Sequence, residues 1–234
     1  MLQSIKGLFG EKLGASDGDI GHVEDLYFDD QNWAVRYVVA NTGSWLPGRQ
    51  VLIAPHAFGN IHVAGKALLV NLTRKEIENS PPIESHKPVS RQYEEAYYRY
   101  YGWPCYWQGG GLWGMSGFPS PQRAEPSFPD GPVTGRAEPT HRADAHLRSV
   151  QAMHGYSIKH HDEIIGEVCD FMMDGKRWAI RELVGKTGNW LSGKEVSIPT
   201  GKVDRISFEE STVFVSVPRA SLVNRSAHAP VAAG

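Results

Sequence analysis

The sequence contains little cysteine, with only Cys105 and Cys169 among its 234 residues. Two cysteines cannot build a disulfide framework or a CxxC metal site, so a reducing compartment is the default expectation. No stretch approaches the roughly 18 apolar residues that a membrane-spanning helix needs. The start MLQSIKGLFGEKLG also lacks the apolar run and cleavage pattern of a signal peptide. We therefore expect a cytoplasmic protein, with peripheral association with a membrane left open.

The sequence also lacks an excess of charge of either sign, since its formal net charge is -2. A near-neutral chain offers no global electrostatic reason to bind nucleic acid, which argues against such a partner. No GxSxG, HExxH, P-loop or dinucleotide fingerprint occurs in it. These absences predict a protein that is not an enzyme and that has no cofactor, no metal and no catalytic residues.

What the sequence does contain is an internal duplication. The phrase TGSWLPGRQVLIAP at 42–55 returns 145 residues later as TGNWLSGKEVSIPT. At this offset residues 4–74 align with 149–219 without a gap, and 16 of the 34 positions from 20 to 53 are identical. Unrelated segments would agree at roughly one position in fifteen. The spacing is too long for a solenoid repeat, so each copy is predicted to be a small domain with its own core.

Each copy carries the pattern of a small sheet. Apolar residues alternate in WAVRYVVAN (33–41) and in WAIRELVGK (178–186), which is the period of a half-buried strand. A second apolar run precedes each of them across the turn signals DDQN and DGKR, which predicts a hairpin. Together with further short strands, each copy holds about six, enough to close a small barrel. Thr73 and Glu76 have capping-box spacing and predict a short closing helix.

The stretch DGDIGHVEDLYFDDQNWAVRYVVANTG (17–43) resembles the PRC-barrel domain, the family of the photosynthetic reaction centre H subunit and of a ribosome maturation factor. The resemblance is carried by a D-G turn followed by I-G-x-V-x-D-x-x-x-D. The second copy keeps this pattern in HHDEIIGEVCDFMMD, with Glu163 in place of the turn glycine. The resemblance covers both copies and implies small β-barrels used as docking modules, in bacterial stress or photosynthetic-membrane physiology, with no catalytic residue set.

The expected organisation is all-β, with two small PRC-like β-barrels in tandem and a short aromatic helix and a disordered Pro/Gly-rich linker between them. Pro, Gly and small polar residues dominate positions 116–148, and such segments bury too little apolar surface to order the chain. The expected boundaries are 1–80 for the first repeat, 81–148 for the aromatic helix and linker, 149–222 for the second repeat, and 223–234 for a disordered tail.

An aromatic segment, SRQYEEAYYRYYGWPCYWQGGGLWG, starts at Ser90 inside the connector. Ser90 can cap a helix whose tyrosines form a single stripe, ended by Gly102 and Pro104. We interpret the stripe as packing on a barrel or on a partner chain. The alternative is that segment 93–113 stacks on unpaired RNA bases or binds a small ligand. Its candidate interaction residues are Tyr93, Tyr97, Tyr100, Trp103 and Trp107.

Two further candidates lie in glycine-bounded loops, where Trp45 and Trp190 are followed by Arg49 and Lys194. Either these tryptophans plug the barrel ends or they meet a partner, since aromatic and arginine side chains are favoured at interface centres. All four residues are therefore candidate interaction residues.

Carboxylates at the hairpins have a structural interpretation. We predict ion pairs of Asp25 with Arg36 and of Asp170 with Arg181, as opposite neighbours on one face of the sheet, each contributing about 0.2–1 kcal/mol. An enzyme remains an alternative that rests on scattered carboxylates and histidines, such as HHDE at 160–163, which we interpret as a solvated turn. The leading hypothesis is a non-catalytic interaction protein whose two barrels bind a protein partner, with the partner's identity and the oligomeric state left open.

Overall fold

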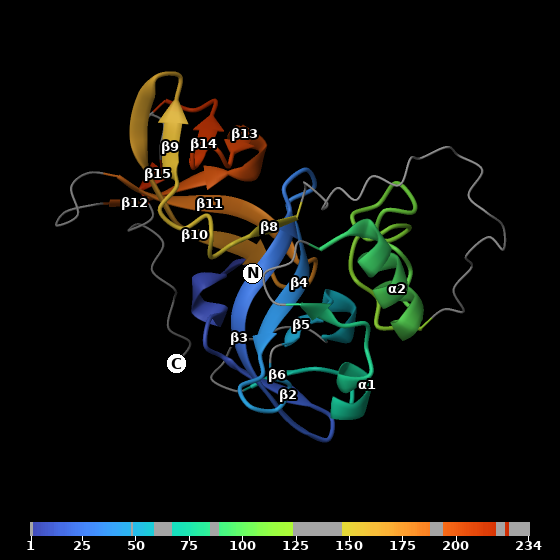
Figure 1. Cartoon of the computed structure of the whole chain (residues 1–234). Coiled ribbons are helices and arrows are strands. Elements are labelled where there is room, and N and C mark those ends of the chain that lie inside the picture. The colour runs from blue at the N-terminus through green and yellow to red at the C-terminus, as the bar shows by residue number, and fades with distance from the viewer. Residues whose placement is uncertain are drawn as a thin grey trace, which may run out of the picture. The chain divides into compact units, whose positions relative to one another are not determined.

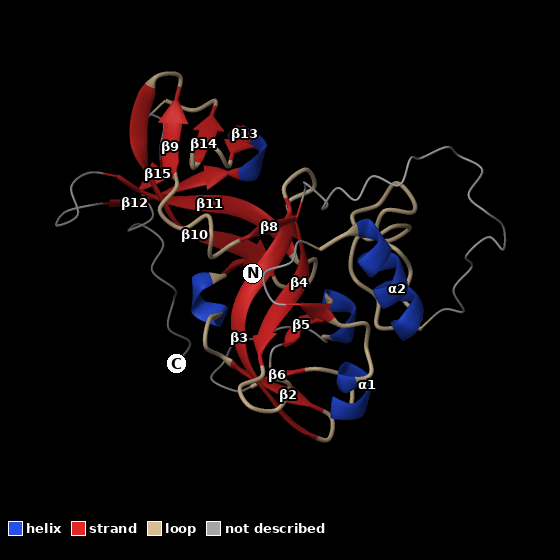
Figure 2. Cartoon of the chain, in the orientation of Figure 1, coloured by secondary structure: helices blue, strands red, loops and turns tan. Residues whose placement is uncertain are grey.

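The computed structural model describes residues 2–47, 49–58, 67–84, 89–123, 147–187, 194–218 and 223–224. The chain divides into two compact units, of which unit 1 holds residues 1–7, 149–175 and 179–234, and unit 2 holds residues 8–148 and 176–178. Strands dominate both units (Figure 1, Figure 2), so the predicted all-β class is confirmed. No helix in the described ranges is long and apolar enough to cross a membrane.

Unit 2 is built on a sheet in which β4, β3, β2 and β6 follow one another, with β5 on the outer side of β4 and β7 on β5. All pairs are antiparallel except β2 with β6. Its strands are β2 (Lys12–Ala15), β3 (Gly18–Asp29), β4 (Ala34–Asn41), β5 (Arg49–Ile53), β6 (Leu68–Leu69), β7 (Ile83–Glu84) and β8 (Leu147–Ser149). Its helices are η2 (Pro55–Ala57), α1 (Arg74–Glu78) and α2 (Arg91–Tyr101), and η1 (Lys6–Leu8) precedes β2.

Unit 1 repeats this order, with β11, β10, β9 and β14 in sequence and β12 on the outer side of β11. The pair β9 and β14 is parallel, as β2 and β6 are in unit 2. The elements of unit 1 are β1 (Leu2–Ser4), β9 (Ser157–His160), β10 (Glu163–Asp174), β11 (Ala179–Thr187), β12 (Lys194–Pro199), η3 (Thr200–Lys202), β13 (Val203–Ser207), β14 (Thr212–Val215) and β15 (Val223–Asn224). The duplicated sequence therefore specifies the same strand order in both units.

The first segments of the two repeats are exchanged between the units. β1 belongs to the first repeat by sequence, but it pairs antiparallel with β10 in unit 1. The segment one repeat later, β8, pairs with β3 of the first repeat, and Arg148 there contacts Asp30 at 2.6 Å in unit 2. The predicted boundaries at 1–80 and 149–222 therefore separate the repeats along the chain, but they do not separate the units.

The hairpin of unit 2 has a register that the alternation of apolar residues did not reveal. Asp25 lies opposite Val39, with register shifts on both sides of it along β3. One bulge leaves Glu24 of β3 without a ladder partner, and the other leaves Arg36 of β4 without one, so Arg36 does not lie opposite Asp25. Arg36 pairs with Asp29 at 3.0 Å, and the predicted pairing of Asp25 with Arg36 is wrong.

The hairpin of unit 1 departs from the prediction in the same way. Asp170 lies opposite Val184, with register shifts along β10. Its carboxylate accepts hydrogen bonds from the Ser4 hydroxyl at 2.5 Å and from the Lys6 amide at 2.9 Å. The Arg181 side chain is exposed. The predicted pairing of Asp170 with Arg181 is therefore wrong, because this carboxylate holds the exchanged segment instead.

The closing helix predicted for the first repeat and the aromatic helix predicted for the connector are both present. The Thr73 hydroxyl and Glu76 form the full capping box of α1. The Ser90 hydroxyl accepts from the Tyr93 amide at the start of α2, which ends at Gly102 with a φ of 68°. Local capping signals therefore predicted both helices.

The outcome of the disorder predictions is divided. Most of the linker expected at 116–148 lies outside the described residues, which resume at 147. The tail expected to be disordered from 223 begins with β15, where Asn224 pairs with Val196 of β12. Backbone pairing with a sheet edge orders these two residues although their composition gave no such signal.

Candidate functional site

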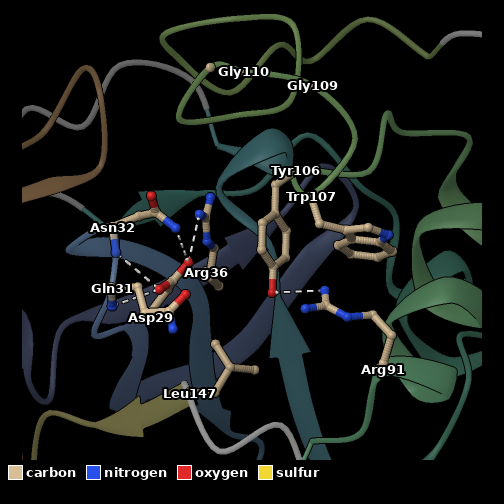
Figure 3. Close-up of a pocket in the computed structure, with 11 residues that line it drawn as sticks. Asp29, Gln31, Asn32, Arg36, Arg91, Tyr106, Trp107, Gly109, Gly110 and Leu147 are labelled. Atoms are coloured by element: carbon tan, nitrogen blue, oxygen red, sulfur yellow. Dashed lines mark hydrogen bonds and ion pairs between the residues drawn. The ribbon is translucent and has the colours of Figure 1, made fainter. Parts of the chain in front are cut away.

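A pocket of about 310 Å³ opens in unit 2 where four parts of the chain meet, one of which is β8 with Leu147 (Figure 3). The β3–β4 turn supplies Asp29, and the following strand supplies Arg36. The start of α2 supplies Arg91, and the loop after α2 supplies two aromatic side chains and a run of three glycines. The described connector is therefore part of unit 2 and forms one wall of this site.

Asp29 lines the pocket, and its side chain is fixed by hydrogen bonds within the hairpin. Its carboxylate accepts hydrogen bonds from the Gln31 and Asn32 amides, from the Asn32 side chain at 2.8 Å, and from Arg36 at 3.0 Å. Burial raises the pKa of Asp29, but the hydrogen bonds from Asn32 and the charge of Arg36 outweigh it and leave the pKa below its ordinary value. The carboxylate is therefore ionised, and both of its oxygens already accept hydrogen bonds. This arrangement suits a structural role better than that of a general base.

Arg36 joins the hairpin to the connector. Its side chain is 1% exposed, and its second terminal nitrogen donates to the Leu112 carbonyl at 2.7 Å. The guanidinium lies 3.7 Å from the centre of the Tyr106 ring and 4.9 Å from that of Trp113. Such stacking is favourable for arginine because its planar cation is weakly hydrated.

Glu94 is a second carboxylate, fully buried on α2, that does not line the pocket but contacts Tyr106 and Arg91, which do. It accepts hydrogen bonds at 2.9 Å from the hydroxyls of Tyr37 and Tyr106, and it pairs with Arg91 at 2.9 Å. Burial, followed by the charge of Glu94, raises the pKa of Tyr106 far above its ordinary value. Arg91 also lies 4.3 Å above the Trp107 ring. The carboxylates of Asp29 and Glu94 are therefore both bonded to partners within unit 2.

The loop after α2 is tightly folded around its glycines. The Gly111 amide donates to the Gly114 carbonyl at 2.6 Å, and the Trp113 amide donates to the Ser116 carbonyl at 2.9 Å. A Cβ on Gly111 would lie 2.6 Å from the Ser116 carbonyl oxygen, so only glycine fits there. The loop leaves Met115 91% exposed, with its sulfur beside Gly109 at the pocket. A large apolar side chain is thus presented to solvent on a constrained backbone.

The glycines of this loop allow a matched test of its rigidity. We expect Gly111→Ala to destabilise unit 2 by about 1–3 kcal/mol, because the added methyl group collides with backbone. A Cβ on Gly110 would meet nothing within 4 Å, so Gly110→Ala should change the free energy of unfolding by less than about 0.5 kcal/mol. Urea unfolding followed by tryptophan fluorescence measures both variants. Equal effects of the two would contradict the proposed packing of the loop.

The aromatic stripe of α2 packs inside unit 2. The Tyr97 hydroxyl donates to the Leu52 carbonyl at 3.0 Å and accepts from the Ala54 amide at 2.9 Å, beside β5. Trp103 is also buried. Of the other candidates, Tyr93 is half-buried, Trp107 lines the pocket, and Tyr100 is exposed and donates to a carbonyl of α1.

The loop candidates have different environments. Arg49 donates to the carbonyls of Ile77, Glu78 and Ser80 at the end of α1, which is a structural clamp. Trp45 is half-buried, and the guanidinium carbon of Arg74 lies 4.5 Å from the centre of its ring. Trp190 lies outside the described residues. The Lys194 side chain is exposed at the start of β12. A role of these residues in binding a partner stays a prediction.

Sequence reasoning missed the pocket and a buried histidine near it. His56 in η2 is enclosed by the rings of Trp103, Tyr98 and Trp113. The sequence signal for the pocket and for the buried histidine is the high density of aromatic residues and glycines after α2, which is not typical of a linker. Among the residues that the structure describes, no group of three His, Cys, Asp or Glu side chains can hold a metal ion.

Comparison with known proteins adds one positive finding. The model of the PRC-barrel domain family matches residues 155–222, which include the strands of unit 1 from β9 to β14. No curated protein sequence matches the chain.

Proposed function

The chain contains a PRC-barrel domain at residues 155–222, and from this premise we propose that it is a non-catalytic docking protein that binds a protein partner at the rim of the pocket in unit 2. The family supports an interaction or adaptor role. The observation that supports the location is the glycine-constrained loop that holds Met115 in solvent beside Gly109, a residue of the pocket that Trp107 and Arg91 also line. Methionine, aromatic and arginine side chains are enriched at the centres of protein interfaces.

The chemistry of the pocket supports binding over catalysis. A general base needs a lone pair directed at its substrate, and the carboxylates of Asp29 and Glu94 both accept several hydrogen bonds from unit 2. A binding surface gains from the same arrangement, because fixed side chains lose little conformational entropy when a partner arrives.

The alternative of RNA or small-ligand binding by segment 93–113 has less support. Base stacking requires an open aromatic face, and the rings of Tyr97, Tyr98, Trp103 and Trp113 are buried in unit 2. We propose a cytoplasmic location from the low cysteine content of the sequence. We propose a role in bacterial stress or photosynthetic-membrane physiology on the strength of the domain family alone.

The docking surface can be tested with a charge placed at its exposed apolar side chain. Partners are first identified by crosslinking mass spectrometry on cells that express the chain. We then expect Met115→Glu to weaken capture of the crosslinked partner roughly tenfold or more, because a charge at an interface centre must be desolvated. Ile164→Glu is the matched control, since Ile164 is apolar and 58% exposed but belongs to unit 1.

The outcome of this pair of variants decides the location. Retained capture by Met115→Glu, with loss by Ile164→Glu, would move the docking surface to unit 1 and refute the pocket rim. Equal capture by both variants and the unmodified chain would refute docking through either exposed side chain.

A further inference from the structure

The N-terminal segment occupies a well-formed binding site on unit 1. Its backbone pairs with β10, with Leu2 opposite Asp174 and Ser4 opposite Met172, and the Ile5 amide donates to a carbonyl of β10 at 2.9 Å. Asp170 accepts from both the Ser4 hydroxyl and the Lys6 amide. Ile5 is completely buried. Strand addition, a charge-assisted hydrogen bond and an apolar anchor together form the usual elements of peptide recognition.

The repeat contains a second segment of the same chemistry. LQSIKGL at 2–8 corresponds to LRSVQAM at 147–153. The Ser149 hydroxyl accepts from the Ala152 amide at 2.9 Å, just as the Ser4 hydroxyl accepts from the Gly7 amide at 3.0 Å. Each segment pairs with the long hairpin strand of the other repeat, β1 with β10 and β8 with β3. Each repeat therefore binds the first segment of the other repeat instead of its own.

We infer that the site formed by β10 and Asp170 can be occupied by the N-terminal segment of a second copy of this chain, which yields a strand-exchanged dimer. The contacts would be the same in the monomer and in the dimer, so their strength cannot favour either form. The segment continues through Gly7 to η1 and β2, with Gly10 at a φ of 78° next to that path. The chain's own segment is therefore favoured over that of a second copy only because its covalent attachment keeps it close to the site.

The protein concentration during folding then decides whether the monomer or the strand-exchanged dimer forms. A short flexible tether supplies an effective concentration on the order of 1 mM, so a second copy competes when the protein reaches that concentration during folding. Once formed, the dimer should persist on dilution, since release requires the buried Ile5 anchor and the β1 pairing to open. This inference does not depend on the proposed docking function, because it concerns a different unit and a different partner.

A cysteine pair at register partners can distinguish the two forms. The full chain carrying Leu2→Cys and Asp174→Cys is unfolded in urea, refolded at two concentrations, roughly fiftyfold below and close to the effective concentration, and then oxidised. We expect the dilute sample to run as a monomer with positions 2 and 174 linked within one chain. The concentrated sample should contain a reducible dimer in which the same two positions link two chains, as peptide mapping would show.

Controls make each result decisive. The single variants Leu2→Cys and Asp174→Cys should give no such dimer, which excludes linkage through the free Cys105 and Cys169. The unmodified chain, refolded at the higher concentration and then diluted, should show a dimer by light scattering. Monomer at both concentrations, in the unmodified chain and in the double variant, would overturn the inference. Absence of any linkage between positions 2 and 174 would overturn it as well, because the segment would then not be bound on β10.

Discussion

The free energy of unfolding of unit 2 should fall as the pH is lowered from 6.5 towards 3, and His56→Phe should remove most of that fall. The pKa of His56 is lowered from 6.5 to about 3, first by burial and then by the charge of Arg36. Between these values the unfolded chain binds a proton that the folded chain does not. Stability is therefore lost with falling pH, with a slope approaching about 1.4 kcal/mol per pH unit.

The environment of His56 explains the size of this effect. Its ring is 1% exposed and is stacked on Trp103 with 5.4 Å between centroids, while the edges of Tyr98 and Trp113 complete the enclosure. Within the described part of the chain, neither ring nitrogen has a hydrogen-bond partner. A charge at this position would be buried without compensation. Below pH 3 the whole shift would lower the free energy of unfolding of unit 2 by about 5 kcal/mol, a large share of a typical folding free energy.

The test compares His56→Phe with His22→Asn, since His22 is an exposed histidine of the same unit. Urea unfolding at pH 7, 6, 5 and 4.5, followed by tryptophan fluorescence, reports on unit 2, because Trp190 is the only one of the seven tryptophans assigned to unit 1. Asp29 does not interfere, since its pKa is lowered from 3.8 and its contribution is lost only below that range. A parallel loss of stability in the unmodified chain, His22→Asn and His56→Phe would show that His56 is not responsible.

The features that the sequence predicted are those that depend on neighbouring residues. Alternating apolar positions and turn residues predicted the hairpin strands, and the Thr73 and Ser90 caps predicted α1 and α2. The bulges beside Asp25 were missed because each requires one extra residue, which the alternation of neighbouring positions does not reveal. In each hairpin the arginine itself falls in a bulge, between Val35 and Tyr37 in β4 and between Ile180 and Glu182 in β11, so neither arginine lies opposite the predicted aspartate.

The features that the sequence did not predict depend on contacts between distant residues. Tyr37 and Glu94 are 57 positions apart, and Arg36 and Leu112 are 76 apart. Their contacts form only because α2 and its loop fold onto the sheet of unit 2. The exchange of β1 and β8 was also hidden, because two equivalent segments fit two equivalent sites and the alignment of the repeats cannot say which segment fills which site.

Arg36→Ala should destabilise unit 2 by about 3–5 kcal/mol, because it leaves the Asp29 carboxylate buried without its cation. The variant also loses the hydrogen bond to the Leu112 carbonyl and the stacking on Tyr106. Arg181→Ala is a matched control at the equivalent position of the second repeat. Since the Arg181 side chain is exposed, its removal should change the free energy of unfolding by less than about 0.5 kcal/mol.

A double-mutant cycle identifies how much of the Arg36 effect comes from the ion pair. If the uncompensated Asp29 carboxylate is the main cost, Asp29→Asn combined with Arg36→Ala should be clearly less destabilising than the sum of the two single variants, by about 1–3 kcal/mol. Additive effects would instead assign the cost to the lost contacts of Arg36 with Leu112 and Tyr106. If Arg36→Ala is as mild as Arg181→Ala, then Arg36 does not hold the connector to the hairpin, and the wall of the pocket must be held by Glu94 and its two tyrosines.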